Sequence, residues 1–578
     1  MNEFKKFVYT PAGYNDASLA IAACRAGGIG ILNAELSADS DKLLEQFALL
    51  SVHARNPFGI KVDTPQKALL SAAAASVDQG FSYLIVDELV LASLVTEIKR
   101  LRKLGVTVLV EVTNAHTDAA TLEKQVDGLM VKGHEAGGFV GEGSSFILLQ
   151  KWSAKTGLPL FVRGGITPHV AAACSAVGAK GGVLESQVLL LKDSPLSERL
   201  SSFIGNLSGN ETIAVGDEEL GAYFRVLVRP GYREAQAFNN NVSGRLVNPE
   251  DVLGKIDWDA PQKGLLPLGQ DVCFAKAWRE KYGYLSNVFA AIDQTIHDSM
   301  QTAIQYKPLA ENAPLAEALG VRFPLVQGPM SRVSDSAEFA GAVADGGALP
   351  MLAFALLKGA ALDKLLAETD KRLGDKPWGI GLLGFAPQSL LDEQIELAQK
   401  YKPQYAIIAG GRPDQAVKLE QEGIQSFLHV PSANLIPLFL QEGARRFIFE
   451  GRECGGHIGP LSSFVLWSSM VDRLLEELES GKTKGEGIQL LFAGGIHDAA
   501  SAAMVQVLAA PLLDKGVQVG ALMGSSYLFT KEIVESGAIV PAFQKEVVEC
   551  EHTVSLESGP GHASRCAYTP FAKMFFDK

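Results

Sequence analysis

The hydrophobic residues of this chain fall in short continuous runs, each followed by glycine or polar residues and then by a stretch with helical spacing. Continuous apolar runs are typical of strands that are buried on both faces, and strands that alternate with helices form parallel sheets. The second half holds eight such runs, over residues 323–330, 348–355, 378–385, 405–411, 426–432, 446–453, 490–496 and 517–526.

The first half has the same count. Eight strand–helix units in succession predict a closed (β/α)₈ barrel of the TIM type, so the α/β chain is predicted to contain two of them in tandem. The alternative is a pair of doubly wound open sheets, which the matched counts disfavour. The runs of the first half cover residues 7–13, 28–34, 58–63, 83–88, 106–113, 128–134, 160–166 and 181–186.

The stretch between the two sets of runs is polar and irregular. It begins near 206, contains NNNVSGRLVNPEDV, and ends in helical patterns before residue 316. It is too long for a simple linker. The predicted organisation is a barrel over 1–205, a small connecting subdomain over 206–315, and a second barrel over 316–578.

One loop occurs in both barrels. Residues 450–460 read EGRECGGHIGP and residues 131–141 read VKGHEAGGFVG, each after an apolar run and before a Ser-Ser-Phe. His457 in the second copy corresponds to Phe139 in the first. The repeat therefore predicts that the two barrels share a scaffold and differ in chemistry.

The chemistry of TIM barrels lies in the loops that follow the strands, and phosphate groups bind mainly after strands seven and eight. Glycines before helices leave backbone N–H groups available to an anion. The second half therefore predicts a site for a phosphorylated cofactor. The loops concerned are Gln327 to Met330, Gly451 to Gly459, Ala493 to Ile496 and Gly524 to Ser526.

The motifs GRECGGHIGPLSSF, LFAGGI and ALMGSS resemble those of the FMN-dependent nitronate monooxygenase (2-nitropropane dioxygenase-like) family, which includes FMN-dependent enoyl-acyl-carrier-protein reductases. The resemblance covers most of 320–570. It implies that the FMN phosphate lies near Gly494, Gly495, Gly524 and Ser525, and that His457 is catalytic beside the flavin. Further cofactor contacts are expected at Gln327, Gly328, Pro329, Met330, Gly381, Glu453, Gly455, Gly456, Ala493 and Met523.

Two positions depart from the family pattern. Gly381 stands where the family often has Asn, and Leu522 stands where it has Gln before the final glycine. Both changes remove side chains that could hydrogen-bond a flavin. They are therefore expected to weaken these hydrogen bonds and to affect both the affinity for FMN and the reaction.

An imidazole titrates near neutral pH, so His457 can serve as the base that a nitronate oxidase needs or as the proton donor of an enoyl reductase. The remaining histidines considered are expected to be structural. Cys454 corresponds to Ala136, which indicates a place for a small side chain rather than a nucleophile. The histidines expected to be structural are His429, His497, His552 and His562.

The first barrel reads as a degenerate copy that has lost its cofactor. Phe139 replaces the proton-handling residue, and Glu185 falls where the second barrel has Gly524, so its charge would repel a phosphate. His134 is shifted by five positions from His457. The alternative, that the first barrel binds a different ligand, rests on Arg163 beside its double glycine.

The composition of the chain argues against several classes of function. With 578 residues and a net charge of −13, the chain does not suit nucleic acid or an anionic membrane as a main partner. The six cysteines form no CxxC pair, which gives no sign of a metal site and suits a reduced cytoplasm. The N-terminal residues lack the apolar core of a signal peptide, and no apolar run reaches the length of a membrane helix.

The sequence thus predicts a flavoprotein oxidoreductase. The favoured reaction is reduction of an enoyl thioester on an acyl carrier protein, with NADPH or NADH as reductant, in fatty-acid or polyketide synthesis. The C-terminal FAKMFFDK suits a segment of a larger synthase or a partner to one. Oxidation of alkyl nitronates by O₂ and a non-catalytic docking module are the alternatives, and a homo-oligomer is left open.

Overall fold

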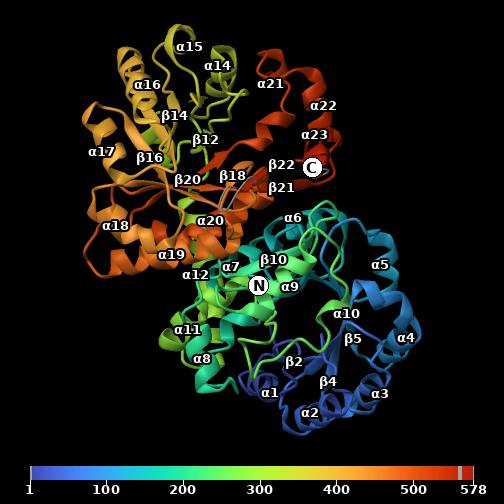
Figure 1. Cartoon of the computed structure of the whole chain (residues 1–578). Helices are drawn as coiled ribbons and strands as arrows, with labels where there is room; N and C mark the ends of the chain where they lie inside the picture. Colours follow the sequence, from blue (N-terminus) through green and yellow to red (C-terminus); the bar gives the residue numbers. More distant parts are fainter. Residues whose placement is uncertain (1–2, 558–562, 577–578) are drawn as a thin grey trace. The chain divides into compact units, whose positions relative to one another are not determined.

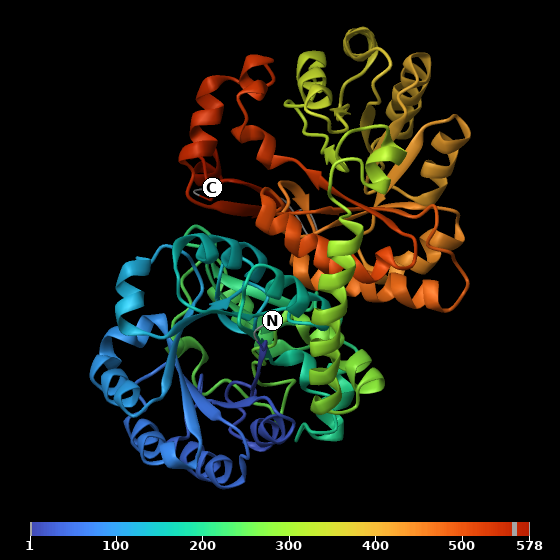
Figure 2. The same cartoon turned by 180° about the vertical axis from the view of Figure 1, so that it is seen from behind.

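The computed structural model describes residues 3–557 and 563–576. The chain divides into two compact units, Met1–Asp298 and Ser299–Lys578 (Figure 1). Each unit contains a barrel of eight parallel strands. Helices lie around the strands, as the view from behind shows (Figure 2). The predicted pair of TIM-type barrels is therefore confirmed, and the open-sheet alternative is wrong.

The first barrel is closed, because its first strand pairs with its last. Its interior is an apolar layer contributed by every second residue of the strands, including Phe7, Ile85, Met130 and Phe161. The strands follow in spatial order β1 (Lys5–Tyr9), β2 (Ile29–Asn33), β3 (Phe58–Val62), β4 (Phe81–Asp87), β5 (Thr107–Val112), β6 (Gly128–Lys132), β8 (Leu160–Arg163) and β9 (Gly181–Leu184).

Helices connect these strands and surround the barrel. Some of these helices begin with a capping side chain: Thr167 accepts a hydrogen bond from the Val170 N–H, and Pro168 follows it at the first helical position. The helices are α1 (Ser18–Arg25), α2 (Ser40–His53), α3 (Lys67–Ala75), α4 (Val95–Lys103), α5 (Ala119–Gln125), α6 (Ser145–Lys155), α7 (Pro168–Ala176) and α8 (Glu198–Ile204).

Residues 206–298 belong to the first compact unit. The predicted connecting subdomain begins with a hairpin, β10 (Thr212–Asp217) and β11 (Ala222–Leu227), which pairs with β7 (Gly138–Gly141) of the repeated loop. The helices that follow are α9 (Arg233–Val242), α10 (Pro249–Val252), α11 (Ala275–Lys281) and α12 (Leu285–Tyr306).

The second barrel is nearly closed. β12 and β13 are the first and last strands in the sheet order, and a parallel bridge links Val326 of β12 to Leu349, two residues before β13. The order is β12 (Leu325–Gln327), β20 (Gln518–Met523), β19 (Gln489–Ala493), β17 (Arg446–Glu450), β16 (Gln425–His429), β15 (Tyr405–Ala409), β14 (Gly379–Leu383) and β13 (Met351–Ala353).

The helices of the second unit repeat the plan of the first, and a hairpin again pairs with the repeated loop. The hairpin comprises β21 (Thr553–Glu557) and β22 (Ala563–Ala567), and β22 pairs with β18 (Gly456–Ile458). The helices are α13 (Pro314–Leu319), α14 (Ala337–Asp345), α15 (Gly359–Leu373), α16 (Gln388–Tyr401), α17 (Pro413–Gln421), α18 (Ile436–Gln441), α19 (Ser463–Glu479), α20 (Ala499–Leu513), α21 (Glu532–Glu535), α22 (Pro541–Glu549) and α23 (Pro570–Phe576).

The two hairpins are anchored by the same pair of residue types. Arg225 donates from Nε to the carbonyl of His134 at 2.7 Å, and Arg565 donates from Nε to the carbonyl of Arg452 at 2.9 Å. In each hairpin the guanidinium also reaches the hydroxyl of a threonine, Thr212 or Thr553. The internal repeat therefore extends beyond the barrel to the hairpin that lies against the repeated loop.

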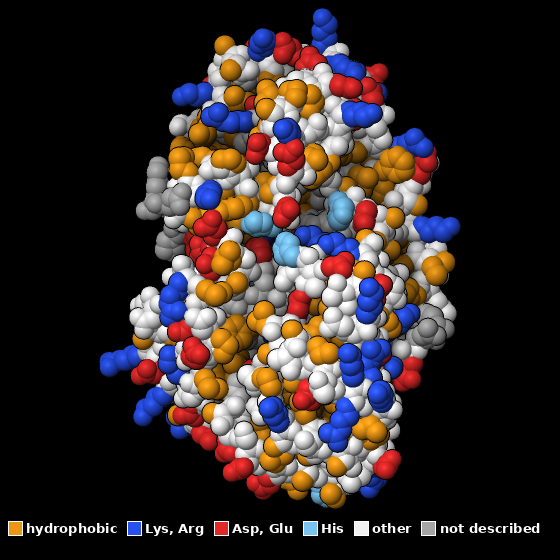
Figure 3. Space-filling view, turned by 90° about the vertical axis from the view of Figure 1, so that its right-hand side faces the viewer, with side chains coloured by type: hydrophobic (Ala, Val, Ile, Leu, Met, Phe, Trp, Pro, Cys, Tyr) orange, Lys and Arg blue, Asp and Glu red, His pale blue; other side chains and the backbone are white. Residues whose placement is uncertain are grey.

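Within the described residues, no helix combines the length and apolar character needed to cross a bilayer. On the face shown in Figure 3, Lys and Arg side chains are interspersed with Asp and Glu side chains. Nucleic-acid binding relies on surfaces of one sign. The expectation that nucleic acid is not a partner stays a prediction.

Candidate functional site

The double-glycine loop of the second barrel is held by Glu453. Its carboxylate accepts hydrogen bonds from the backbone N–H of Ser463, at 2.8 Å, and from the Ser463 hydroxyl. Ser463 is the first residue of α19, where a negative charge is favourable. Gly451 has no side chain because a Cβ there would collide with Ser463. Glu453, which the sequence assigned to the cofactor, thus fixes the loop to a helix start.

Three loops meet at this end of the second barrel. A Cβ on Gly455 would lie 2.8 Å from the Ser525 hydroxyl, and one on Gly494 would lie 2.9 Å from the Ser463 hydroxyl and 3.4 Å from the backbone nitrogen of Cys454. The loops after β17, β19 and β20 are therefore in close contact. The predicted residues that this contact brings together are Glu453, Gly455, Gly494 and Ser525.

The loop after β12 joins the same region. Gly328 donates its N–H to the Met523 carbonyl at 2.8 Å. A Cβ on Gly524 would lie 3.7 Å from the Met330 sulfur, which is an ordinary contact, so this glycine leaves space beside Met330. Predicted residues of the first and eighth strands therefore lie side by side.

Gln327 and Gly381 have internal roles in this structure. Gln327 is buried, and its side-chain amide accepts from the Met351 N–H at 3.1 Å and donates to the Gly328 carbonyl. Pro329 fills the space where Gly381 would carry a Cβ. Both therefore make contacts that shape the first loop, and their contact with a cofactor stays a prediction.

Gly494 and Gly495 adopt left-handed backbone conformations, with φ of 119° and 71°, and their counterparts Gly164 and Gly165 adopt the same conformations, at 113° and 69°. Side chains other than glycine rarely take these angles. The turn after strand seven is therefore preserved in both barrels.

The start of α20, which follows that turn in the second barrel, is already capped. The Asp498 carboxylate accepts from the Ser501 N–H at 2.8 Å and from its hydroxyl at 2.6 Å. Because a carboxylate occupies this helix terminus, a phosphate would use the glycines and Ser525 beside it rather than the α20 start.

His457 lies in β18 with its side chain exposed. It pairs with Ser564 of β22, whose hydroxyl lies 3.3 Å from His457 Nδ1. The ring also stands edge-on to Phe385, with centroids 6.4 Å apart. Sequence reasoning missed both neighbours, because neither belongs to the repeated loop.

In the first barrel the same place is apolar. Phe139 pairs with Phe224 of β11, and their rings meet edge to face at 5.0 Å in a cluster that includes Phe238. The neighbouring His134 is buried, and its Nδ1 lies 2.9 Å from the Gly141 carbonyl. The loop of the first barrel is thus built as part of a hydrophobic core.

Charged residues fill the strand ends of the first barrel. The Arg163 guanidinium, 1% exposed, forms ion pairs with Glu111 at 2.7 Å, Glu185 at 2.7 Å and Glu35 at 3.1 Å. Burying such charges is costly unless they are paired and hydrogen-bonded, and here they pair with one another. Arg163 is therefore committed to internal partners, which removes the basis for a ligand at that residue.

Two lysines complete this charge cluster. Lys61 lies 2.8 Å from Glu35 and 3.3 Å from Glu111, and Lys132 lies 3.4 Å from Glu111. Burial alone would raise the pKa of Glu111, but Arg163, Lys132 and Lys61 outweigh it and lower the pKa to about 2. The carboxylate is therefore ionised at neutral pH.

The strand register shows what the second barrel has at these positions. Lys132 and Glu450 both directly precede the repeated loop, and Glu111 corresponds to His429 on the neighbouring strand. The other charged positions have small counterparts. These pairs are Lys61 and Gly381, Asp87 and Ala409, Arg163 and Ala493, and Glu185 and Gly524.

His429 and Glu450 are the ionisable pair that the second barrel keeps in this layer. His429 Nδ1 lies 2.6 Å from a carboxylate oxygen of Glu450, and the two side chains are 21% and 20% exposed. The sequence predicted His429 to be structural, and nothing in a single strand shows that a histidine and a glutamate from neighbouring strands will meet.

Cys454 has the properties of an inert thiol. Burial raises its pKa well above the usual value, and the charge of Glu450, to which the thiol also hydrogen-bonds, adds to the effect. A nucleophilic cysteine needs a lowered pKa. This environment is consistent with the expectation that Cys454 serves as a small side chain and not as a nucleophile.

Two of the other histidines have local contacts of their own. His497 is exposed, with Nδ1 3.2 Å from the Gly495 carbonyl, and His552 stacks on Tyr568 with ring centroids 4.8 Å apart. His562 lies outside the described residues.

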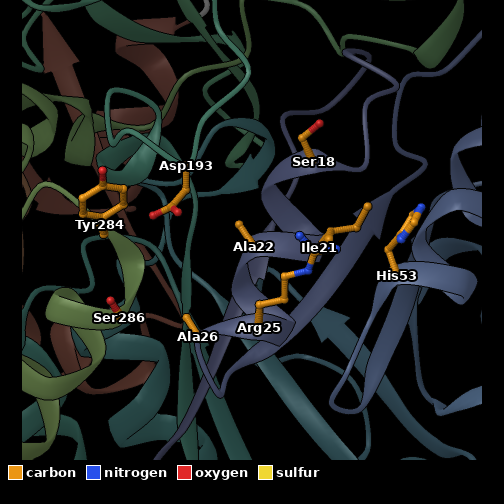
Figure 4. Close-up of a pocket in the computed structure, with 9 residues that line it drawn as sticks. All are labelled: Ser18, Ile21, Ala22, Arg25, Ala26, His53, Asp193, Tyr284 and Ser286. Atoms are coloured by element: carbon orange, nitrogen blue, oxygen red, sulfur yellow. The ribbon is translucent and has the colours of Figure 1, made fainter.

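A cavity of about 490 Å³ lies elsewhere, in the first unit (Figure 4). Among its lining residues, Arg25 and His53 are the last residues of α1 and α2, directly before the segments that lead into β2 and β3. This part of the lining therefore lies at the amino-terminal ends of the strands. In TIM barrels that end ordinarily contributes to stability, and catalysis takes place at the other end.

No family model matches the chain. A curated relative, the (3aS,4S,5R,7aS)-5-hydroxy-7a-methyl-1-oxo-octahydro-1H-indene-4-carboxyl-CoA dehydrogenase of Mycobacterium tuberculosis, is 28% identical over 229 residues, which are 39% of this chain and 58% of the relative. The protein of the same name from Rhodococcus jostii is 27% identical over 219 residues, 38% of this chain and 55% of the relative. The chain thus spans less than two thirds of these relatives.

Among solved structures, FabK from Thermotoga maritima is similar with a TM-score of 0.44 and 20% identity, over 52% of this chain and 95% of that chain. A nitroalkane oxidase from Streptomyces ansochromogenes is similar with a TM-score of 0.38 and 19% identity, over 51% of this chain and 97% of that one. Each of these likenesses covers about half of the present chain.

Proposed function

We propose that the second barrel binds FMN at the carboxyl ends of its strands and that the protein is a flavin-dependent oxidoreductase. One observation supports the proposal: in the layer that holds ion pairs in the first barrel, the second barrel has the small residues Ala409, Ala493 and Gly524. A ligand can lie over small residues, whereas the first barrel is closed by its own charges.

The residues present fit a phosphorylated flavin. Gly494, Gly495, Gly524 and Ser525 offer backbone N–H groups and a hydroxyl to the phosphate, and Met330 supplies an apolar, polarisable surface along the ring. When bound, FMN supplies the acceptance and donation of hydride. The protein supplies binding, orientation and the proton.

His457 is the residue that handles the proton. Since Nδ1 lies against the Ser564 hydroxyl, Nε2 is the ring nitrogen that can face a substrate. The imidazole donates a proton to the substrate carbon next to a thioester carbonyl, or removes one from a nitronate precursor. The substrate therefore decides which direction is used.

The favoured substrate is an enoyl thioester carried by an acyl carrier protein, with NADPH or NADH as reductant. The names of both curated relatives specify a CoA thioester, which supports a thioester as the substrate class. Oxidation of alkyl nitronates by O₂ remains the second candidate, because the exposed imidazole of His457 suits a base as well as an acid.

The test is anaerobic reduction of the flavoprotein by NADPH or NADH, followed by mixing with a crotonyl thioester, a nitronate or O₂. Rapid reoxidation by the thioester supports the proposal. Reoxidation by O₂ and conversion of the nitronate, without a reaction with the thioester, favours the second candidate. A colourless protein that binds no added FMN contradicts both and favours a docking module.

A further inference from the structure

A histidine–carboxylate pair lies in the layer where the second barrel otherwise has small residues. His429 is the last residue of β16 and Glu450 is the last residue of β17. Both point into the barrel, because Phe427 and Ile448, two residues earlier on the same strands, belong to the interior apolar cluster. The pair therefore faces the end of the barrel where the proposed ligand binds.

Glu450 fixes the orientation of the His429 ring. The carboxylate oxygen lies 2.6 Å from Nδ1, which is a short, charge-assisted distance that places a proton on Nδ1. The Cys454 thiol also hydrogen-bonds to Glu450. Glu450 is thus held from two sides, and the imidazole cannot turn without losing its partner.

The other ring nitrogen has no such partner. His429 Nε2 is buried and forms no hydrogen bond with any of the described residues. Buried polar atoms are nearly always satisfied, and an exception calls for an explanation such as a bound ligand. In the first barrel the corresponding Glu111 is fully satisfied by Arg163 and two lysines.

From this geometry we infer that His429 hydrogen-bonds the ligand of the second barrel through Nε2, with Glu450 as the residue that orients it. Because the proton lies on Nδ1, Nε2 of the neutral ring is an acceptor, so the ligand atom is an N–H or O–H donor, supplied either by the flavin or by the substrate. His429 is then a second polar contact of the site, separate from His457. This inference rests on the proposed function.

The experiment compares full-length His429→Leu, His429→Gln and Glu450→Gln with wild type. Leu removes the acceptor, and Gln keeps a side-chain carbonyl oxygen that can accept in its place. His116→Gln, at an exposed histidine of the first unit, is the matched control. Equilibrium binding of FMN to apoprotein is measured by quenching of flavin fluorescence, and kcat and KM are measured with the thioester.

A hydrogen bond to an imidazole that a carboxylate polarises corresponds to about 10-fold to 100-fold in an equilibrium constant. His429→Leu is expected to weaken FMN binding by that factor if the donor is on the flavin, or to raise KM with FMN binding unchanged if it is on the substrate. His429→Gln recovers part of the loss, and Glu450→Gln gives a smaller loss in the same measurement.

Thermal unfolding of each apoprotein establishes that the variants are folded. If His429→Leu and Glu450→Gln are folded and match His116→Gln in both FMN binding and KM, the inference is wrong although the proposed function stands. If wild type itself binds no FMN, the proposed function fails and the inference falls with it.

Discussion

His457 lies opposite Ser564 in the second unit, in the same register in which Phe139 lies opposite Phe224 in the first. One copy of the loop pairs a proton-carrying ring with a hydroxyl at 3.3 Å, and the other packs two phenyl rings at 5.0 Å. The same backbone therefore carries a reactive side chain in one barrel and a piece of hydrophobic core in the other.

Replacing His457 by Ala is expected to leave FMN bound, because the proposed phosphate contacts lie after strands seven and eight. Turnover should fall by about 10²–10⁴-fold, the usual cost of losing a positioned acid or base. The loss should appear when substrate reoxidises the flavin, and reduction by the nicotinamide cofactor should change little. Rapid-mixing absorbance at the flavin band separates the two half-reactions.

Phe139→Ala is the matched control for this variant. Because Phe139 is only partly buried, it should destabilise the first unit by about 1–3 kcal/mol, less than a change at a fully buried phenyl ring, while turnover per folded molecule stays near that of wild type. A Phe139→Ala protein that is folded but inactive would show that the active site has been assigned to the wrong barrel.

The carboxylate that anchors each loop provides a second matched pair. Glu453→Gln weakens the contact with the first turn of α19, where Glu453 accepts from Ser463, so the His457 loop should lose its position and activity should fall at least 10-fold. Glu135→Gln changes the equivalent contact with Ser145 in the first barrel. We expect that variant to lower stability, measured by urea unfolding, without lowering turnover per folded molecule.

Glu185 does more than repel an anion. Its carboxylate forms two hydrogen bonds with Arg163, at 2.7 and 3.1 Å, so Glu185→Gly should leave a buried guanidinium partly uncompensated and cost about 3–5 kcal/mol. Because Arg163 and both lysines remain, this variant should gain no flavin site. Binding of a second FMN per chain by a folded Glu185→Gly protein would refute the view that the whole charge cluster closes the barrel.

Asp271 gives the first unit a characteristic pH dependence. Burial, aided by the charge of Glu185, raises the pKa of Asp271 from its ordinary 3.8 to about 7. A carboxyl group whose pKa is higher in the folded state stabilises that state below pH 4 and loses this contribution as the pH rises to 7. Asp271→Asn should therefore remove a decline of a few kcal/mol between pH 4 and 7, as measured by urea unfolding. Identical slopes in wild type and variant would contradict this assignment.

The barrels and the repeated loop could be predicted because strands buried on both faces leave continuous apolar runs. The hairpin Thr212–Leu227 could not, since its stretch of sequence reads as polar and irregular. A signal was present in the Thr and Arg that recur in both hairpins, at Thr212 and Arg225 and at Thr553 and Arg565. It becomes visible only when the strand register is known.

The chemistry of the strand ends was predicted only in part. Glu185 was found because it interrupts a glycine motif, whereas Lys61 and Lys132 each sit in an apolar strand and give no periodic signal. Their partners come from other strands, so the charge cluster exists only in three dimensions. The pair of His429 and Glu450 escaped notice for the same reason.

Only the second barrel is proposed to be open to a flavin, and the flavin content of the protein tests this most directly. Purified wild-type protein, reconstituted with excess FMN and desalted, is expected to hold one FMN per chain. Gly524→Glu, which gives the second barrel the residue that the first has at Glu185, is expected to hold none while remaining folded. Two FMN per wild-type chain, or full retention of FMN by a folded Gly524→Glu protein, would contradict the account.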